Sequence, residues 1–511
     1  MRKYLKRLPL IIILILSLAV RLALIAKGAF NIDSLQMALL AEKVLATGQL
    51  QFQYGTGYPL TILLGSLFIY LGKLIQISDP VISFNFMSVF FSTLSVFVFY
   101  MLTDYLFNRR AAIFAASLFT INPIFLDISL FGMSHAPCIF FILLAVYYYL
   151  LAGENGEEKK IYLSAFFLGL AGAVRFQEMG MIIIALIFHS LYTATQKNQN
   201  VKFSQLIKRL SAYCTITFFT TLCFHLPYFL TDIRHEYIAQ LGHYSQLSFS
   251  LWPNLATLTS LTDKLSFIFY NFHNHTIYYI IEGLTPMGVF ASLAGCLLAW
   301  RAKQNLCVLL LFWIMIPLAI YGLQMTSSAR FLTFIMPPFY ILLGYLFAQT
   351  LSFSPLSRLI SLTIFLSIFF LSITQNFPFF ISRHHQDTIK EYALWVKKKT
   401  EPNAYIINSD EGLFVQHYGE RKHLSRPLGY TFIKEDDLKN FKMKLDRMLN
   451  ERTPVYITSN ALHVYDPRKQ FAALIKGHYQ LKLAGSQYCE YWHRSPFEQL
   501  LFYVNLYRIQ P

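Results

Sequence analysis

Charged side chains are scarce in this chain. Asp, Glu, Lys and Arg make up 14% of its 511 residues, whereas hydrophobic residues make up 55%. A typical soluble domain carries about 25% charged residues, so this composition excludes an ordinary soluble protein. Apolar runs recur from Leu8 to about Phe377 and then stop. The sequence therefore predicts a polytopic membrane protein followed by a soluble tail.

Cysteine and motif signals are equally sparse. The six cysteines show no metal-ligand spacing, and only Cys489 lies in the tail, which argues against a disulfide framework. The tail contains no Gly-rich phosphate loop, no zinc pattern and no GxSxG motif. The chain also shows no internal repeat, whereas transporters often consist of paired halves.

Acidic residues are fewer than basic ones, 27 against 43, which gives a net charge of +16. Many of the Lys and Arg residues lie in short loops between apolar runs, a pattern that marks cytoplasmic loops and not a nucleic-acid groove. We therefore predict a cytoplasmic N-terminus and no nucleic-acid partner. The basic loops contain Arg109-Arg110, Lys159-Lys160, Lys202, Lys208-Arg209, Arg301 and Lys303.

Eleven apolar segments approach the length of about 20 residues that crosses the hydrocarbon core. They are 8–26, 82–106, 111–127, 135–151, 161–175, 179–194, 210–231, 278–300, 306–323, 331–350 and 359–377. With the N-terminus inside, these spans place every basic loop in the cytoplasm and the tail outside. The predicted fold class is an α-helical polytopic membrane domain (1–378, about 11 transmembrane helices) with a small extracytoplasmic α/β domain (379–511).

One apolar run, Pro59–Ile77, is interpreted differently, because counting it as a span would move the Arg109-Arg110 loop outside. We predict that it forms an interfacial or re-entrant helix in a first outer loop of about 27–81. Before it, Asp33 or Ser34 can cap a helix that ends at Gly48. A large outer loop is predicted at about 232–277.

The tail alternates helix and strand signals. Segments 384–400 and 436–449 have helical periodicity, while AYIIN and PVYIT are typical of strands and YQLKLAG is a further candidate. Such alternation favours a small α/β layer.

Several segments of the membrane half resemble those of a known group of enzymes. They are Arg21, Asp33-Ser34-Leu35-Gln36, Thr56-Gly57-Tyr58-Pro59-Leu60, NRRAAIFAASLFTINPIFL, GLAGAVRFQEM and SSARFLTFIMPPFYILLGYLFA. In this order they resemble the GT-C superfamily of polytopic glycosyltransferases, in particular the bacterial dolichyl-phosphate-mannose-protein mannosyltransferase and aminoarabinose transferase branch. The resemblance implies transfer of a sugar from a polyprenyl-phosphate donor to an acceptor on the outer face of the bacterial inner or cytoplasmic membrane.

The resemblance also implies roles for particular residues. Asp33 matches the acidic residue of the first outer loop, taken as the catalytic base, but Ser34 and Leu35 stand where a second acid is usual. His135 occupies the place of another acid in the second outer loop, and Asp127 is a nearby substitute. A divalent metal site is therefore left open, and no cofactor is assigned.

Arg175 and Arg330 match positions where the family places basic residues that face the donor phosphate, and Glu178 and Tyr58 are candidate supporting residues. An arginine fork suits a phosphate, and sugar transfer needs a base at the acceptor hydroxyl. Each residue also has a simpler interpretation. Asp33 could only cap its helix, His135 could be an interfacial histidine, Arg175 could snorkel, and Glu178 is expected to pair with Arg175.

We therefore predict a membrane glycosyltransferase that acts on a polyprenyl-phosphate sugar donor and a lipid, glycan or protein acceptor, in contact with membrane lipids. Two alternatives stay open at this point. One is a transporter or flippase of a lipid-linked sugar, and the other is a catalytically inactive relative that binds glycolipid.

Overall fold

The computed structural model describes residues 8–53, 57–155, 157–196, 203–231, 233–239, 260–322, 328–409, 411–427, 433–463, 466, 468–489 and 502–511. Contacts within the chain divide it into two units. The helical unit comprises Met1–Ile25, Met37–Phe380 and Ser495–Phe497, and the second unit comprises Ala26–Gln36, Ile381–Arg494 and Glu498–Pro511. The domain boundary at residue 378 stays a prediction. The extent of the large outer loop also stays a prediction, and residues 232 and 240–259 of that loop lie outside the described residues.

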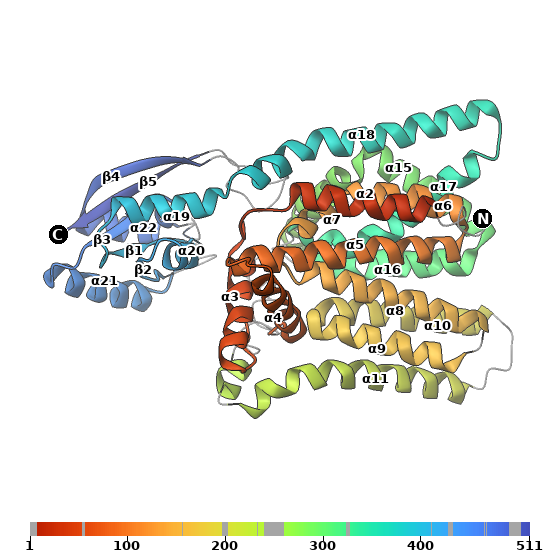
Figure 1. Ribbon diagram of the computed structural model, residues 1–511, viewed down its shortest axis with the longest axis horizontal. Helices are drawn as coiled ribbons and strands as arrows, with labels where there is room; N and C mark the ends of the chain where they lie inside the picture. The colour runs from red at the N-terminus through yellow and green to blue at the C-terminus, as the bar shows by residue number, and fades with distance from the viewer. Residues whose placement is uncertain are drawn as a thin grey trace. The chain divides into compact units, whose positions relative to one another are not determined.

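The helical unit consists mainly of long apolar helices that run in nearly the same direction (Figure 1). Its helices are α2 (Leu8–Leu24), α4 (Pro59–Leu74), α5 (Pro80–Leu106), α6 (Arg109–Ile121), α7 (Pro123–Leu130), α8 (His135–Asn155), α9 (Glu158–Val174), α10 (Phe176–Gln196), α11 (Phe203–Leu230), α14 (Leu261–Asn271), η1 (Phe272–Ile277), α15 (Tyr278–Ala302), α16 (Gln304–Gly322), η2 (Ala329–Ile335) and α17 (Met336–Thr350). Two helices pass from one unit to the other, α3 (Ile32–Thr47) and α18 (Pro355–His385).

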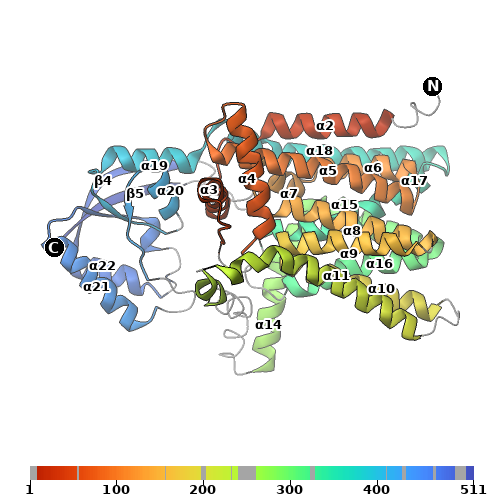
Figure 2. The same cartoon turned by 60° about the horizontal axis from the view of Figure 1, so that its bottom comes forward.

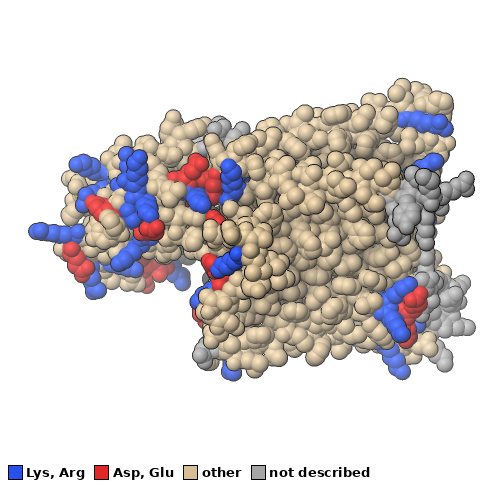
Figure 3. All heavy atoms as spheres, in the orientation of Figure 1, with Lys and Arg blue, Asp and Glu red and all other residues tan. Residues whose placement is uncertain are grey.

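The chain is a multi-pass membrane protein. Among the described residues, eight helices are long and apolar enough to cross a membrane, or up to nine if the bent pair α6 and α7 forms one span. All eleven predicted segments coincide with helical structure, although α2 is shorter than a typical span. On the face of the molecule seen in Figure 3, Lys, Arg, Asp and Glu are almost absent from the middle of the long helices. The number of spans and the membrane side of each terminus stay predictions.

The predicted span 111–127 is not a single straight helix, because α6 and α7 meet at Asn122 with a bend of 57°. That the pair forms one span stays a prediction. Pro123 has no N–H and begins α7, and the Asn122 side chain caps that helix by accepting from the N–H of Phe125 at 2.8 Å. The Asn122 Nδ2 group also donates to the carbonyl of Gly283 at 3.0 Å and to the hydroxyl of Tyr340 at 2.8 Å. One buried amide therefore ties the bend to α15 and α17.

Helix α4 crosses the direction of the long helices (Figure 2), which fits the predicted interfacial placement. Ile62 and Ile69 of α4 pack on Ala41 of α3. As predicted, α3 ends next to Gly48, which adopts a left-handed φ of 69°. The prediction that Asp33 or Ser34 caps α3 is wrong: the helix begins at Ile32, and the side chain of Asn31 accepts from the N–H of Asp33 at 2.8 Å.

The tail of the second unit is a mixed α/β fold, as predicted. Its sheet has the strand order β2-β1-β3-β5-β4, in which β1 is parallel to β2 and β3, and β5 is antiparallel to β3 and β4. The elements are α19 (Thr388–Lys399), β1 (Tyr405–Ile407), α20 (Gly412–His417), β2 (Lys422–His423), α21 (Glu435–Asn450), β3 (Val455–Thr458), η3 (Asn460–Leu462), α22 (Gln470–His478), β4 (Gln480–Cys489) and β5 (Phe502–Gln510).

Apolar side chains of the sheet pack against α21 and α22. This core contains Ile407, Val455, Ile457, Phe441, Leu445, Phe471, Ile475 and Ile509 among its buried residues. The three predicted strands correspond to β1, β3 and β4, and both predicted helices are present as α19 and α21. The short edge strand β2 and the C-terminal strand β5 were not predicted.

Candidate functional site

Arg175 occupies the junction between α9 and α10. Its backbone leaves the helical conformation, with φ −151° and ψ 104°, before α10 begins at Phe176. The guanidinium is buried with 7% exposure, and its Nε donates to Oε1 of Glu178 at 2.6 Å. The predicted pairing of Glu178 with Arg175 is confirmed, and Glu178 is itself 1% exposed. Arg175 is thus a buried, paired arginine, not a snorkelling side chain.

Two hydroxyl groups complete this network. Tyr321 of α16 donates to Oε1 of Glu178 at 2.8 Å, and Nη1 of Arg175 donates to Oγ of Ser134 at 3.0 Å. Four helices therefore meet at one ion pair. Arg175 lies at the junction of α9 and α10, Ser134 directly precedes α8, and Tyr321 belongs to α16. Buried charge pairs persist when further hydrogen bonds support them, and Ser134 and Tyr321 provide such bonds here.

Aromatic rings cover the guanidinium. The Cζ atom of Arg175 lies 5.5 Å from the ring centre of Phe331, 5.9 Å from that of Phe334 and 5.7 Å from that of Tyr58. Phe331 and Phe334 belong to η2, a 3-10 helix in which residues three apart lie on the same side. Tyr58 precedes α4 in a left-handed conformation with φ 53°. These contacts place the predicted supporting residue Tyr58 directly at Arg175.

His135 is the first residue of α8 and has 1% exposure. Its ring lies 5.9 Å from the ring of Phe334 in a stacked arrangement and 5.8 Å from the ring of Phe331. Among the described residues, neither ring nitrogen has a hydrogen-bond partner. The positive charges of Arg175 and Arg330 both act on the ring. A buried imidazole without partners is costly, because buried polar groups are normally hydrogen-bonded.

Arg330 lies in the first turn of η2 and is partly buried. Its Cζ atom is 5.4 Å from the ring centre of its neighbour Phe331. The structure therefore groups Arg175, Arg330, His135, Glu178 and Tyr58 around the two aromatic rings of η2. We refer to this group, together with Ser134 and Tyr321, as the arginine cluster.

Asp33 lies in the second unit, in the first turn of α3, with 8% exposure. The positive end of a helix dipole at this position favours a carboxylate. Asp127, the suggested substitute acid, is buried within α7. Among the described residues, no three His, Cys, Asp or Glu side chains are placed to hold a metal ion.

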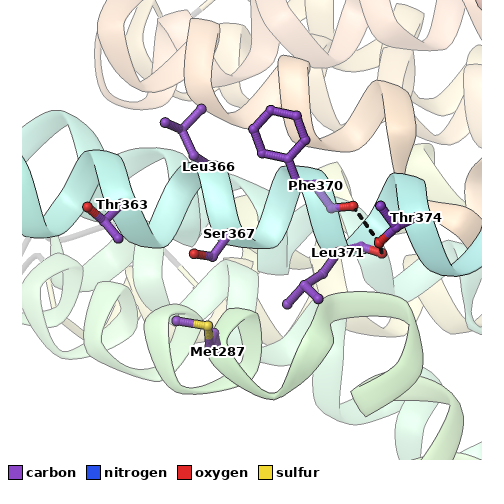
Figure 4. A pocket seen from close by; sticks show the side chains of 7 residues that line it. All are labelled: Met287, Thr363, Leu366, Ser367, Phe370, Leu371 and Thr374. Carbon is purple, nitrogen blue, oxygen red and sulfur yellow. Dashed lines mark hydrogen bonds between the residues drawn. The ribbon is translucent and has the colours of Figure 1, made fainter.

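An open groove lies elsewhere on the helical unit, between α15 and α18. It has a volume of about 470 Å³ and contains no charged side chain (Figure 4). The lining residues are Met287, Thr363, Leu366, Ser367, Phe370, Leu371 and Thr374. The groove is suited to a lipid chain and not to a phosphate.

Four members or neighbours of the arginine cluster were not predicted: Ser134, Tyr321, Phe331 and Phe334. The three-residue spacing of Phe331 and Phe334 was visible in the sequence, but nothing local showed that both rings would lie near Arg175 and His135. No local signal links Tyr321 to Glu178, because 143 residues separate them.

The chain is similar to known proteins in part of its sequence and in its fold. Residues 59–224 match the family model described as dolichyl-phosphate-mannose-protein mannosyltransferase. The structure of ArnT from Cupriavidus metallidurans, bound to undecaprenyl phosphate, superposes with a TM-score of 0.59 at 10% identity, over 98% of this chain and 97% of that one. The chain has the GT-C fold. This finding confirms the resemblance and the fold class predicted from the sequence.

A second GT-C structure gives the same result. The oligosaccharyltransferase of Archaeoglobus fulgidus, in complex with zinc and sulfate, has a TM-score of 0.59 at 15% identity, over 96% of this chain and 72% of that one. The same archaeal enzyme, AglB, is also similar in its complex with an inhibitory peptide and a dolichol-phosphate, with a TM-score of 0.59 at 14% identity, over 94% of this chain and 73% of that one. No curated protein matches the chain in sequence. The matching family and these structural neighbours are glycosyltransferases.

Proposed function

We propose that this chain is a glycosyltransferase that transfers one sugar from a polyprenyl-phosphate carrier to an acceptor on the outer face of the membrane. The observation that carries the proposal is the buried Arg175 beside His135, whose two ring nitrogens lack partners among the described residues. Support also comes from the GT-C fold and from the undecaprenyl phosphate bound by ArnT.

The chemistry requires a stabilised leaving group. An acceptor hydroxyl attacks the anomeric carbon, the bond between that carbon and the phosphate oxygen breaks, and its electron pair leaves with the polyprenyl phosphate. Charge develops on that phosphate, where arginine donors lower the energy of the transition state. We propose Arg175 and Arg330 as these donors, with His135 as a further hydrogen-bond donor. Glu178 holds the Arg175 fork, and Tyr58 covers its face.

The proton of the acceptor hydroxyl needs a base. We propose Asp33 for this role, because the charge pattern of the sequence assigns Asp33 and Arg175 to the same side of the membrane. The positive end of the helix dipole favours a carboxylate at this position, and a carboxylate can accept the proton of the attacking hydroxyl.

The proposal is tested with the purified full chain in lipid nanodiscs. The donor is a panel of undecaprenyl-phosphate sugars with labelled sugar, and the acceptor pool is an extract of bacterial envelope lipids and glycans. We expect label to leave the carrier, and Arg175→Lys to slow this at least tenfold, because lysine cannot form the fork. The matched control is Arg209→Lys, because Arg209 is an exposed arginine that lies 3.6 Å from the carboxylate of Glu158.

The alternatives give other results. Label that crosses the bilayer while still attached to its carrier identifies a flippase. Donor that binds but keeps its sugar in every acceptor extract identifies an inactive glycolipid-binding protein. Either result contradicts the proposal.

A further inference from the structure

Three buried polar side chains of α5 lie on one face of the helix. Asn85, Ser88 and Ser92 are each 0% exposed, and their spacing of three and four residues places them one above the other. Ser92 accepts a hydrogen bond from Nε of Arg21 at 2.9 Å. The other two side chains contact the connection between α7 and α8.

Asn85 and Ser88 bind consecutive backbone groups of that connection. Oδ1 of Asn85 accepts from the N–H of Gly132 at 2.6 Å, and Oγ of Ser88 accepts from the N–H of Met133 at 3.1 Å. Neither N–H belongs to a helix, so each would lose a buried hydrogen bond without its side-chain acceptor.

The same connection fits closely against α5. A Cβ atom built on Gly132 would lie 2.1 Å from Cδ1 of Phe84, so only glycine allows this approach. The backbone of residues 132 and 133 is therefore fixed by packing and by two hydrogen bonds.

The next two residues belong to the arginine cluster. Ser134 accepts from Nη1 of Arg175 at 3.0 Å, and His135 begins α8 with its ring 5.8 Å from that of Phe331 and 5.9 Å from that of Phe334. A continuous series of contacts thus runs from Asn85 and Ser88, through the backbone at 132 and 133, to the guanidinium of Arg175.

We propose that Asn85 and Ser88 are positioning residues of the donor-phosphate site. They hold the backbone that sets the Ser134 hydroxyl and the His135 ring against Arg175, so that these groups meet the phosphate without rearrangement. This inference rests on the proposed function of the arginine cluster. Preorganised donors are effective because they need not be reoriented when the phosphate binds.

Other hydroxyl groups of α5 do not act in this way. Oγ of Ser95 donates to the carbonyl of Phe91 at 2.8 Å, and Oγ1 of Thr103 donates to that of Phe99 at 2.8 Å. Both bonds stay within the helix. Ser95, equally buried at 0% exposure, is therefore a matched control for Ser88.

The experiment measures binding of undecaprenyl phosphate to the purified full chain, and the KM for donor in the transfer assay. Ser88→Ala should weaken binding and raise the donor KM by about five- to tenfold, the effect of one lost hydrogen bond, with the acceptor KM unchanged. Ser88→Thr, which keeps Oγ, should restore binding, and Ser95→Ala should leave it as in the wild type. Asn85→Leu, of similar volume without the acceptor, repeats the test at the second residue.

Two results overturn the inference. If Arg175→Lys weakens undecaprenyl phosphate binding while Ser88→Ala and Asn85→Leu do not, the site stands and the positioning role is wrong. If Arg175→Lys also leaves binding unchanged, the proposed donor site is wrong and the inference fails with it.

Discussion

Arg175 and Glu178, three residues apart where α9 meets α10, form a buried ion pair with an Nε–Oε1 distance of 2.6 Å. Tyr321 donates to the same carboxylate oxygen. Glu178 therefore fixes the direction of the guanidinium and neutralises it in an environment with little water. The pair therefore stabilises the packing of the helical unit as well as orienting the guanidinium of the proposed site.

Removal of the Glu178 charge should destabilise the protein. Glu178→Gln leaves a buried arginine uncompensated, a change that costs about 3–5 kcal/mol when one partner of such a pair is lost. The control is Glu157→Gln, which breaks the exposed Glu157–Lys160 pair of the same three-residue spacing and should cost about 1 kcal/mol or less. Thermal unfolding in detergent measures both. Equal shifts in Tm for the two variants would contradict the burial argument.

Loss of the Asp33 carboxylate should abolish sugar transfer. Asp33→Asn keeps the size of the side chain but removes the base, so we expect kcat to fall by about 10²- to 10⁴-fold with normal unfolding behaviour. Glu42→Gln lies on the same helix, in an exposed pair with Lys73, and should transfer sugar normally. Turnover of Asp33→Asn at the wild-type rate would exclude Asp33 as the base.

Truncation of Asn122 should lower the free energy of unfolding by more than the loss of a helix cap alone. Asn122→Ala removes the cap of α7 and also leaves the Gly283 carbonyl and the Tyr340 hydroxyl short of a partner. We expect a destabilisation of about 2–4 kcal/mol. Asn108→Ala removes an equivalent cap at the exposed start of α6, where Oδ1 accepts from Ala111 at 3.0 Å, and should cost about 1 kcal/mol. Chemical denaturation compares the two, and similar midpoints would mean that the bend is held by packing alone.

The thiol of Cys489 should be unreactive in the folded tail. Burial, together with the charges of Glu411 and Glu391, raises the pKa of this thiol to about 12. Only about one molecule in ten thousand is then a thiolate at pH 8, so iodoacetamide should modify it far more slowly than an exposed cysteine introduced on the same strand by Ser486→Cys. Mass spectrometry of the two peptides gives both rates from one sample.

The same pKa predicts a loss of stability at alkaline pH. The unfolded thiol titrates near pH 8.5 and the folded one near 12, so the unfolded state releases its proton first. Below about pH 8.5 the neutral thiol makes its full contribution to the free energy of unfolding. That contribution falls as the pH rises toward 12. Cys489→Ala should flatten this part of the stability profile, and an unchanged slope would show that other groups cause it.

The sequence was sufficient for features that depend on local pattern. Hydropathy located every long helix, and Gly48 marked the end of α3 through its left-handed conformation. Arg175, Arg330, His135 and Tyr58, distant in sequence, do lie together in the helical unit, although their roles stay predictions. The sequence prediction named Asp33 or Ser34 as the cap of α3 and missed Asn31, because residue type alone does not show that the helix begins at Ile32.

Other features depend on contacts that no local pattern records. The bend at Asn122 is supported by Gly283 and Tyr340, more than 150 residues away. Strand β5 was missed because its partner β4 determines it through long-range pairing. The hydroxyl of Tyr321 becomes part of the arginine cluster only after α16 packs against α10.

The 3-10 geometry of η2 has a consequence for access to His135. Three residues per turn keep the rings of Phe331 and Phe334 in register above the imidazole, whereas α-helical winding would rotate one ring about 60° away from the other. The position of the two rings beside the imidazole therefore depends on how tightly a single turn of backbone is wound, and a local rewinding there changes the surroundings of His135 while the long helices stay where they are.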